Sequence, residues 1–404
     1  MDRLELKSDL LLGSGGCATQ MDGGDLGHSW NLWYATARDP EGVDPAVAAG
    51  HWTHWRDDAM LMARMGLGSC RLGLEWARLE PAEGVFDEDA LDRLKAELML
   101  LRAAGISPLV TLHHFTNPTW FELSGGWSES RNIVYYLRYV ERVVRRLGHL
   151  VDEFITFNDP DLYAFNSQRV GLWPPGHKSL SGAMRVLSTM AAAHIRAYRL
   201  IRRVRGEMRL PPPSVGAAFY LPPVLPRSAK AWYGAAPVTE RLFQTGPAAA
   251  MLLGRFTPPL RNYARAQPGR YCDFLALSYR TGSLPPGRDE GQEMLRAVKR
   301  MHKLCDAPIY LTCTVRGGDD RAACRTLFQL LSAVCASELP IYRYYQWPLL
   351  AGFAWPGFGA DCPLADMEEG TMARRLNGAG RLFAAVARER ALTPEQYAQY
   401  IENA

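Results

Sequence analysis

The chain has 404 residues, of which 48% are hydrophobic and 22% are charged, and its formal net charge is +4. This composition is typical of a globular protein. The small net charge and the absence of any run of five like charges argue against nucleic acid as a partner. No apolar stretch is long enough to span a membrane, and the first residues lack the basic lead of a signal peptide, so we expect no membrane partner.

Eight cysteines are spread along the chain without a CxxC pair, and no His/Cys cluster has the spacing of zinc ligands. This pattern predicts reduced thiols in a cytoplasmic protein and no structural metal. The sequence also shows no sign of an organic cofactor, so we expect the chain to act without one.

Short β-favouring runs alternate with longer segments that carry apolar residues at three- and four-residue spacing. Strands are predicted at residues 10–20, 69–80, 107–115, 153–159, 214–221, 273–280, 308–315 and 342–355. Helices are predicted at residues 51–65, 87–104, 132–151, 183–205, 293–305, 321–339 and 372–390, with Asp87 and Ser181 as start signals.

Strands that alternate with helices imply right-handed crossovers and a parallel sheet, and eight such units close into a barrel. We therefore predict an α/β fold, a (β/α)8 TIM barrel that forms a single domain over residues 1–404. The Pro-rich, least regular stretch at about residues 221–270 is predicted to be an excursion after the fifth strand, with a helix at 239–256.

The run Ile155-Thr156-Phe157-Asn158-Asp159-Pro160 ends the fourth predicted strand. Three β-favouring residues lead to an amide, a carboxylate and a proline at the point where the strand must stop. Asn158 and Asp159 leave the strand end in different directions, so one ligand would contact both only by lying across that end. Asn-Asp-Pro is by itself also a turn sequence.

Functional side chains of such a barrel lie at the C-terminal ends of the strands. The predicted ends carry polar and aromatic residues: Gln20, Asp22, Arg71, Trp76, His113, His114, Phe115, Asn158, Asp159, Tyr279, Arg280, Cys313, Trp347 and Trp355. A polar pocket with aromatic walls suits a sugar, because hydroxyls need paired donors and acceptors and ring C–H faces stack on indole. His194, on a predicted outer helix, is expected to be structural.

Several motifs in order resemble family 1 glycoside hydrolases, the β-glucosidase group, along nearly the whole chain. They are ATQ at 18–20, CRLGLEWARLEP at 70–81, VTLHHF at 110–115, GGW at 125–127, TFNDP at 156–160, Asp273-Phe274 with Tyr279, PIYLT at 308–312, and Trp347 with FAW at 353–355. The resemblance implies the same (β/α)8 barrel and a small-molecule sugar, glycoside or related metabolite as the partner.

The resemblance also implies roles for individual residues. Gln20, His114, Asn158 and Trp347 match positions that bind the sugar at the cleavage subsite, and Arg71 matches the arginine beside the nucleophile. Tyr279 and Trp355 belong to the matched motifs and are counted with the substrate-binding residues. Trp120 and Phe121 match the side of the leaving group.

Both catalytic carboxylates of the family pattern are changed. Its acid/base glutamate is Asp159, and its nucleophilic glutamate is Cys313. The tyrosine that would bond the nucleophile is Arg280, and the glutamate that binds outer sugar hydroxyls is Ala354. A polar Asp-Asn pair of the family is Ala351-Gly352.

A retaining glycosidase needs two carboxyl groups about 5–5.5 Å apart. Asp159 is one methylene shorter than glutamate, and a misplacement of about 1 Å can cost on the order of 100-fold in rate. A Cys313 thiolate, favoured by Arg71 and Arg280 if they lie close, could attack a sugar, but it has no second oxygen to stabilise the charged transition state. We expect ordinary retaining hydrolysis to be slow or absent.

Two guanidinium groups without a carboxylate would bind an anion. One hypothesis is therefore that the ligand is anionic near Arg71 and Arg280; the alternative is that Arg280 points outwards into a surface salt bridge.

Three functions stay open. The first is a diverged glycosidase or glycosyl-transferring enzyme with Asp159 as acid/base and Cys313 as nucleophile or filler. The second is a pseudoglycosidase that binds without cleavage, and the third is a small-metabolite tailoring enzyme that reuses the pocket.

Overall fold

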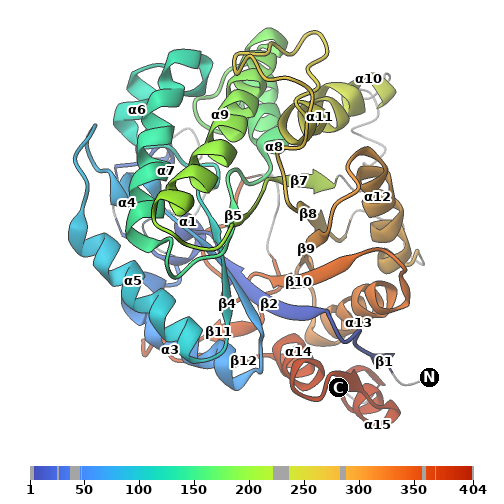
Figure 1. Ribbon diagram of the computed structural model, residues 1–404. Helices are drawn as coiled ribbons and strands as arrows, with labels where there is room; N and C mark the ends of the chain where they lie inside the picture. The colour runs from blue at the N-terminus through green and yellow to red at the C-terminus, as the bar shows by residue number, and fades with distance from the viewer. Residues whose placement is uncertain are drawn as a thin grey trace.

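The computed structural model describes residues 4–24, 27–36, 46, 48–221, 236–282, 288–356, 361–368 and 370–402. Its main sheet has nine parallel strands in the order β6-β5-β4-β3-β2-β10-β9-β8-β7 (Figure 1). Only Ala217 separates β6 (Ser214–Gly216) from β7 (Ala218–Leu221); β6 pairs with β5, and β7 pairs with β8. The two are one interrupted strand position that closes an eight-position barrel, as predicted.

Most of the other barrel strands end earlier than predicted, because the chain there turns into the loops of the barrel mouth, whereas the strand predicted at 273–280 ends at Arg280 as expected. They are β2 (Leu11–Gly16), β3 (Ser69–Gly73), β4 (Ser107–Thr111), β5 (Glu153–Ile155), β8 (Leu275–Arg280), β9 (Ile309–Thr314) and β10 (Ile341–Trp347). Two small antiparallel pairs lie outside the barrel: β1 (Leu4–Glu5) with β13 (Ala391–Leu392), and β11 (Ala365–Met367) with β12 (Arg374–Leu376).

Long helices surround the barrel (Figure 1). They are α3 (His51–Arg64), α5 (Glu88–Ala103), α7 (Ile133–Leu147), α9 (Leu180–Glu207), α12 (Glu290–Leu304), α13 (Asp320–Ala336) and α14 (Gly378–Glu389). Shorter helices are α1 (Ala18–Met21), α2 (Ser29–Ala35), α4 (Trp76–Leu79), α6 (Thr119–Leu123), α8 (Pro160–Ala164), α10 (Ala236–Glu240), α11 (Gly246–Leu253) and α15 (Pro394–Tyr397).

Capping side chains set several helix starts. Asp87 accepts a hydrogen bond from the Ala90 amide at 2.8 Å and begins α5, as predicted. The start of α9 is capped by Ser179, not by Ser181, because Ser179 accepts from the Gly182 amide at 3.0 Å. The last predicted helix is shorter than expected, because residues 374–376 form β12 instead.

The predicted excursion at about 221–270 falls partly on residues 222–235, which lie outside the described residues. Its described part contains α10, a π-helical turn at Arg241–Thr245, and α11. His194 of α9 is fully buried behind the barrel, where its ring nitrogens lie 2.7 Å from Thr156 Oγ1 and 2.9 Å from the Tyr271 carbonyl. These contacts give it a structural role, as expected.

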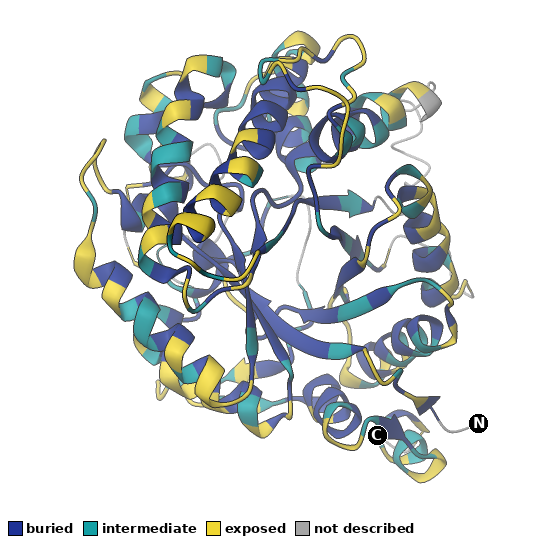
Figure 2. Ribbon diagram, in the orientation of Figure 1, coloured by how far each residue is buried: buried dark blue, intermediate teal, exposed yellow. Residues whose placement is uncertain are grey.

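Strand parity decides which side chains enter the barrel. A separate interior cluster contains Ala276 of β8, Tyr310 of β9 and Tyr345 of β10. Since side chains alternate along a strand, Thr312 and Thr314 face the interior with Tyr310, whereas Ile309, Leu311 and Cys313 face the helices. Figure 2 shows the barrel strands largely buried and the outer faces of the surrounding helices exposed.

Candidate functional site

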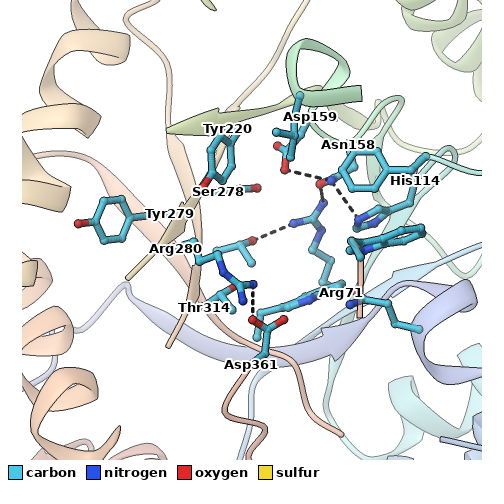
Figure 3. Close-up of a pocket in the computed structure, with 16 residues that line it drawn as sticks. Arg71, His114, Asn158, Asp159, Tyr220, Ser278, Tyr279, Arg280, Thr314 and Asp361 are labelled. Carbon is cyan, nitrogen blue, oxygen red and sulfur yellow. Dashed lines mark hydrogen bonds and ion pairs between the residues drawn. The ribbon is translucent and has the colours of Figure 1, made fainter. Parts of the chain in front are cut away.

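A pocket of about 70 Å³ lies at the C-terminal mouth of the barrel (Figure 3). Its volume is enough for about five water molecules. Ten residues were predicted to act in catalysis or to bind the substrate. Nine of them line this pocket: Gln20, Arg71, His114, Asn158, Asp159, Tyr279, Arg280, Trp347 and Trp355. The tenth, Cys313, does not.

Arg71 of β3 is the centre of a buried hydrogen-bond network. Its guanidinium donates to Asn158 Oδ1, to Thr312 Oγ1 at 2.9 Å and to Thr111 Oγ1 at 3.2 Å. Because Asn158 Oδ1 accepts from a cation, the amide nitrogen must be the donor on its other side. That nitrogen lies 3.0 Å from His114 Nε2 and donates to Asp159 Oδ2 at 3.1 Å.

This network leaves two polar atoms for a ligand. His114 Nε2 accepts from Asn158, so the ring proton of the neutral imidazole lies on Nδ1; burial, with the nearby Arg71 charge, holds the His114 pKa well below its usual range. His114 Nδ1 and Asp159 Oδ1 are both buried and have no hydrogen-bond partner among the described residues. One donor and one acceptor are therefore available to a hydroxyl group.

Asp159 has the environment of a proton-transfer group. It sits in the left-handed conformation with φ of 41° directly before Pro160, at the start of α8. Burial raises the pKa of its carboxyl to about 6, although the Arg71 charge and a hydrogen bond from Ser278 oppose the shift. Burial and the charge of Asp159 likewise raise the pKa of Asp161. A carboxyl that titrates near neutral pH can both donate and accept a proton.

The prediction that Cys313 faces the ligand is wrong. Its side chain is fully buried on the outer face of β9, where Sγ lies 3.4 Å from Met294 Sδ of α12. Burial raises the pKa of its thiol above the ordinary range. Parity is the reason, because Cys313 lies three residues after the inward-facing Tyr310. The thiol is neither ionised nor placed to attack a ligand.

Thr312 takes the position beside Arg71. Its hydroxyl lines the pocket and accepts from the guanidinium. The same parity turns the ring of Tyr279 away from the cavity (Figure 3), and its hydroxyl donates to Glu290 Oε2 of α12 at 2.7 Å. Tyr279 therefore borders the pocket without offering its phenol to a ligand.

Arg280 also enters the pocket, where it forms an ion pair with Asp361 (Figure 3). Burial raises the pKa of Asp361 to about 6 against the opposing charge of Arg280. The pocket thus contains two arginines and two carboxylates. This corrects the hypothesis of two guanidinium groups without a carboxylate, and also the alternative that Arg280 points outwards.

Aromatic rings form one wall. The His114 ring is nearly parallel to Trp347 and Trp355, with centroids 5.8 and 6.3 Å away and interplanar angles of 24° and 13°. Trp120 and Phe121, predicted on the leaving-group side, are not among the residues that line this pocket; they pack against Trp76, with centroids 5.7 and 4.8 Å from it.

Gln20 holds the loop after β10 in place. Its amide nitrogen donates to the Phe353 carbonyl at 3.1 Å, and its side-chain oxygen accepts from the Cys17 thiol at 3.2 Å. A Cβ atom at Gly352 would stand 1.7 Å from the Gln20 carbonyl oxygen. Glycine at 352 is thus required by close backbone approach, and the loop cannot carry the family's polar side chain at that position.

Six further residues that line the pocket were not predicted: Leu162, Tyr220, Ser278, Thr312, Thr314 and Asp361. The strict alternation of IYLTCT over β9 contained the signal for both threonines. Asp361 had no such signal, since it comes from a loop. Among the described residues, no group of three or more His, Cys, Asp or Glu side chains is arranged to hold a metal ion.

Comparisons with known proteins place this geometry in a family. The profile of glycosyl hydrolase family 1 matches residues 5–269. β-Glucosidase A of Acetivibrio thermocellus is 27% identical over 238 residues, which are 57% of this chain and 52% of that protein. The chain thus spans about half the length of the curated relatives it matches.

Solved structures agree over nearly the full chain. The β-glycosidase from Pyrococcus horikoshii has a TM-score of 0.85 and 25% identity, covering 99% of this chain and 98% of that one. The β-glucosidase from Thermotoga maritima in complex with deoxynojirimycin has a TM-score of 0.81 at 20% identity, covering 96% of this chain and 100% of that one. With the profile match over most of its length and the shared (β/α)8 barrel, the chain belongs to glycosyl hydrolase family 1.

Proposed function

We propose that the chain binds a sugar or glycoside-like small molecule at the barrel mouth, with Asp159 as its acid/base group and without a covalent glycosyl-enzyme step. The observation that carries this proposal is the hydrogen bond from Arg71 to the neutral Thr312 hydroxyl. The family pattern expects the nucleophilic carboxylate beside this arginine. A hydroxyl there has no negative charge with which to stabilise an oxocarbenium-like transition state.

The ligand class follows from the pocket lining. His114 Nδ1 and Asp159 Oδ1 offer a donor and an acceptor, and the Trp347 and Trp355 rings offer apolar faces. This combination suits the hydroxyls and C–H faces of a sugar. The Thermotoga maritima relative was solved with deoxynojirimycin, which supports a small polyhydroxylated ligand.

Any cleavage would need a nucleophile from outside the chain. Asp159 would give its proton to the leaving oxygen as the glycosidic bond breaks, while a water molecule or the hydroxyl of a second substrate bonds to the anomeric carbon and loses its own proton to solvent. Asp361 lies on another side of the cavity from Asp159 (Figure 3) and is the second, partly buried carboxyl of this pocket. A tailoring reaction by a thiol is not proposed, because Cys313 faces away from the cavity.

Binding without cleavage is the second candidate, and the neutral Thr312 hydroxyl is also the observation that favours it. Aryl β-glycosides, offered to the parent protein and to Asp159→Asn, distinguish the two functions. Turnover that Asp159→Asn abolishes supports acid/base catalysis. Saturable binding by calorimetry without turnover supports the pseudoglycosidase. A covalent sugar adduct on the parent protein, detected by intact mass, would contradict the proposal, and failure of all glycosides to bind would refute the sugar pocket itself.

A further inference from the structure

The charge of this chain is unevenly distributed. Residues 162–272 contain 16 lysines and arginines but only two acidic residues, whereas the rest of the chain contains 30 basic and 40 acidic residues. One segment therefore has a net charge of +14 and the remainder −10, a separation that the total of +4 conceals. Such an asymmetry creates a field on one side of the protein.

Helix α9 carries much of this charge as a stripe. Arg185, Arg196, Arg199 and Arg203 are all exposed. Their offsets of 11, 14 and 18 residues are close to whole numbers of helical turns, so all four lie on one face. The stripe runs along about 27 Å of the helix.

A second segment lies beside this stripe. Arg196 donates to the Tyr263 carbonyl at 2.8 Å, and Arg199 donates to the Tyr271 hydroxyl at 3.0 Å. This segment adds the exposed Arg255, Arg261 and Arg265. We call the seven arginines the basic face. Only Arg203 among them has a carboxylate of a described residue within 4 Å, Glu207 at 3.8 Å.

The basic face contains an amphipathic groove of about 480 Å³ near the start of α9. Leu180, Met184, Pro259 and Tyr263 provide its apolar lining, and Arg185 and Arg261 provide its charges. Leu180 is 44% exposed, so part of its aliphatic side chain is open to solvent at the groove.

Further exposed aliphatic residues lie next to this groove. Val170 and Leu172 are 36% and 41% exposed. The Ser179 amide donates to the Gln168 carbonyl at 2.6 Å, which holds the segment of Val170 and Leu172 against the start of α9. Aliphatic side chains therefore project where the arginines are concentrated.

The same end of α9 is at the barrel mouth. Because α9 follows β5 and leads back to β6, its first residues lie near the C-terminal ends of the strands. Trp173 donates to the Pro356 carbonyl at 3.0 Å, and its ring packs 5.9 Å from Trp355 of the pocket wall. Leu172 is thus one residue from a side chain that supports the pocket.

We propose that the basic face docks on an anionic lipid surface, with lipid phosphates at Arg185 and Arg261 and with Leu172 and Leu180 entering the headgroup region. Arginine forks pair with phosphate oxygens, and clustered cations strengthen attachment to anionic lipids. The exposed aliphatic residues favour a lipid surface over a single-stranded nucleic acid, because bases stack on aromatic rings and Tyr263 is the one aromatic residue among the described residues that line the groove. Within the described residues, no helix combines the length and apolarity needed to cross a bilayer. We propose a peripheral contact, which revises the expectation of no membrane partner, because that expectation rested on the lack of a membrane-spanning stretch.

Sedimentation with phosphatidylcholine vesicles, with and without phosphatidylglycerol, tests the proposal. The full chain should bind only the phosphatidylglycerol vesicles, and high salt should release it. Arg185→Ala with Arg261→Ala should weaken binding about 30-fold, and Leu180→Ser about fivefold. The control pair Arg325→Ala with Arg375→Ala removes two exposed arginines elsewhere and should leave binding unchanged.

Two results would overturn the proposal. In the first, Arg185→Ala with Arg261→Ala binds the vesicles as well as the control pair and the parent do. In the second, a single-stranded oligonucleotide binds more tightly than the vesicles and loses its affinity in Arg185→Ala with Arg261→Ala, which would assign the basic face to nucleic acid. Circular dichroism of every variant excludes loss of folding as the cause.

Discussion

The two halves of the pocket differ in how far they keep the family pattern. The half built from β3, β4 and β5 holds Arg71, His114 and Asn158 in one hydrogen-bond network, within the profile match at 5–269. The half built from β8, β9 and the loop after β10 lies beyond that match and holds Thr312 and the Arg280–Asp361 ion pair. In the proposed function, the changes on the second half remove covalent chemistry and leave a pocket that can bind a polar ligand.

The largest expected effect comes from restoring a carboxylate on the changed half. Thr312→Glu should place an acidic group beside Arg71 and raise turnover of an aryl β-glycoside by on the order of 100-fold or more. Cys313→Glu should give no such gain, because position 313 faces the helices, where an uncompensated charge should destabilise the protein by several kcal/mol.

Initial rates and thermal unfolding of both variants, measured side by side, check this prediction. Thr312→Gln is the matched control, because glutamine has the same shape as glutamate but carries no charge. Activity in Cys313→Glu but not in Thr312→Glu would reverse the assignment of the two positions.

The second prediction concerns the kept half. Asn158→Ala removes the acceptor for the Arg71 guanidinium and the donor to Asp159, leaving buried charges less satisfied. We expect a loss of about 2–3 kcal/mol in the free energy of unfolding, measured by urea denaturation. Ser278→Ala, on the changed half, should cost less than about 1 kcal/mol. Equal losses would mean that the network is no more important for stability than its surroundings.

The third prediction concerns the ion pair. Asp361→Asn leaves the Arg280 charge without its carboxylate, so the pocket should become positive. Affinity for a glucuronide relative to the matched glucoside should rise about tenfold, measured by titration calorimetry. Adding Arg280→Met to Asp361→Asn should abolish this preference for the glucuronide. An unchanged ratio in Asp361→Asn would show that the ligand does not approach this pair.

The smallest expected effect is a pH dependence. The pKa of Asp159 is raised to about 6, so its carboxyl is protonated below that pH and loses the proton above it. If protonation of the leaving group limits turnover, the rate should fall about threefold from pH 5.5 to 6.5. The pKa of Asp361 is also raised to about 6, so Asp361 could produce the same pH dependence. The dependence is assigned to Asp159 only where Asp361→Asn keeps it. A flat profile in the parent would remove Asp159 from the acid role.

Much of the fold could be predicted because the barrel repeats a local pattern. Each strand and helix carries its own periodicity, so the eight strand positions appeared without knowledge of their neighbours. The site residues at strand ends followed from the same rule, and nine of ten line one pocket. Cys313 was misplaced because motif alignment gives a position along the strand, whereas parity determines the face.

The sequence by itself determined the barrel, its mouth and the identity of the acidic residue after Asn158, because these depend on local patterns. The tertiary structure decided which groups meet. It placed Asp361 from a loop beside Arg280, Thr312 beside Arg71, and the arginines of α9 beside those of residues 255–265. Such pairings join residues far apart in the chain, and electrostatic and hydrogen-bond energies depend on distances that only the folded chain sets.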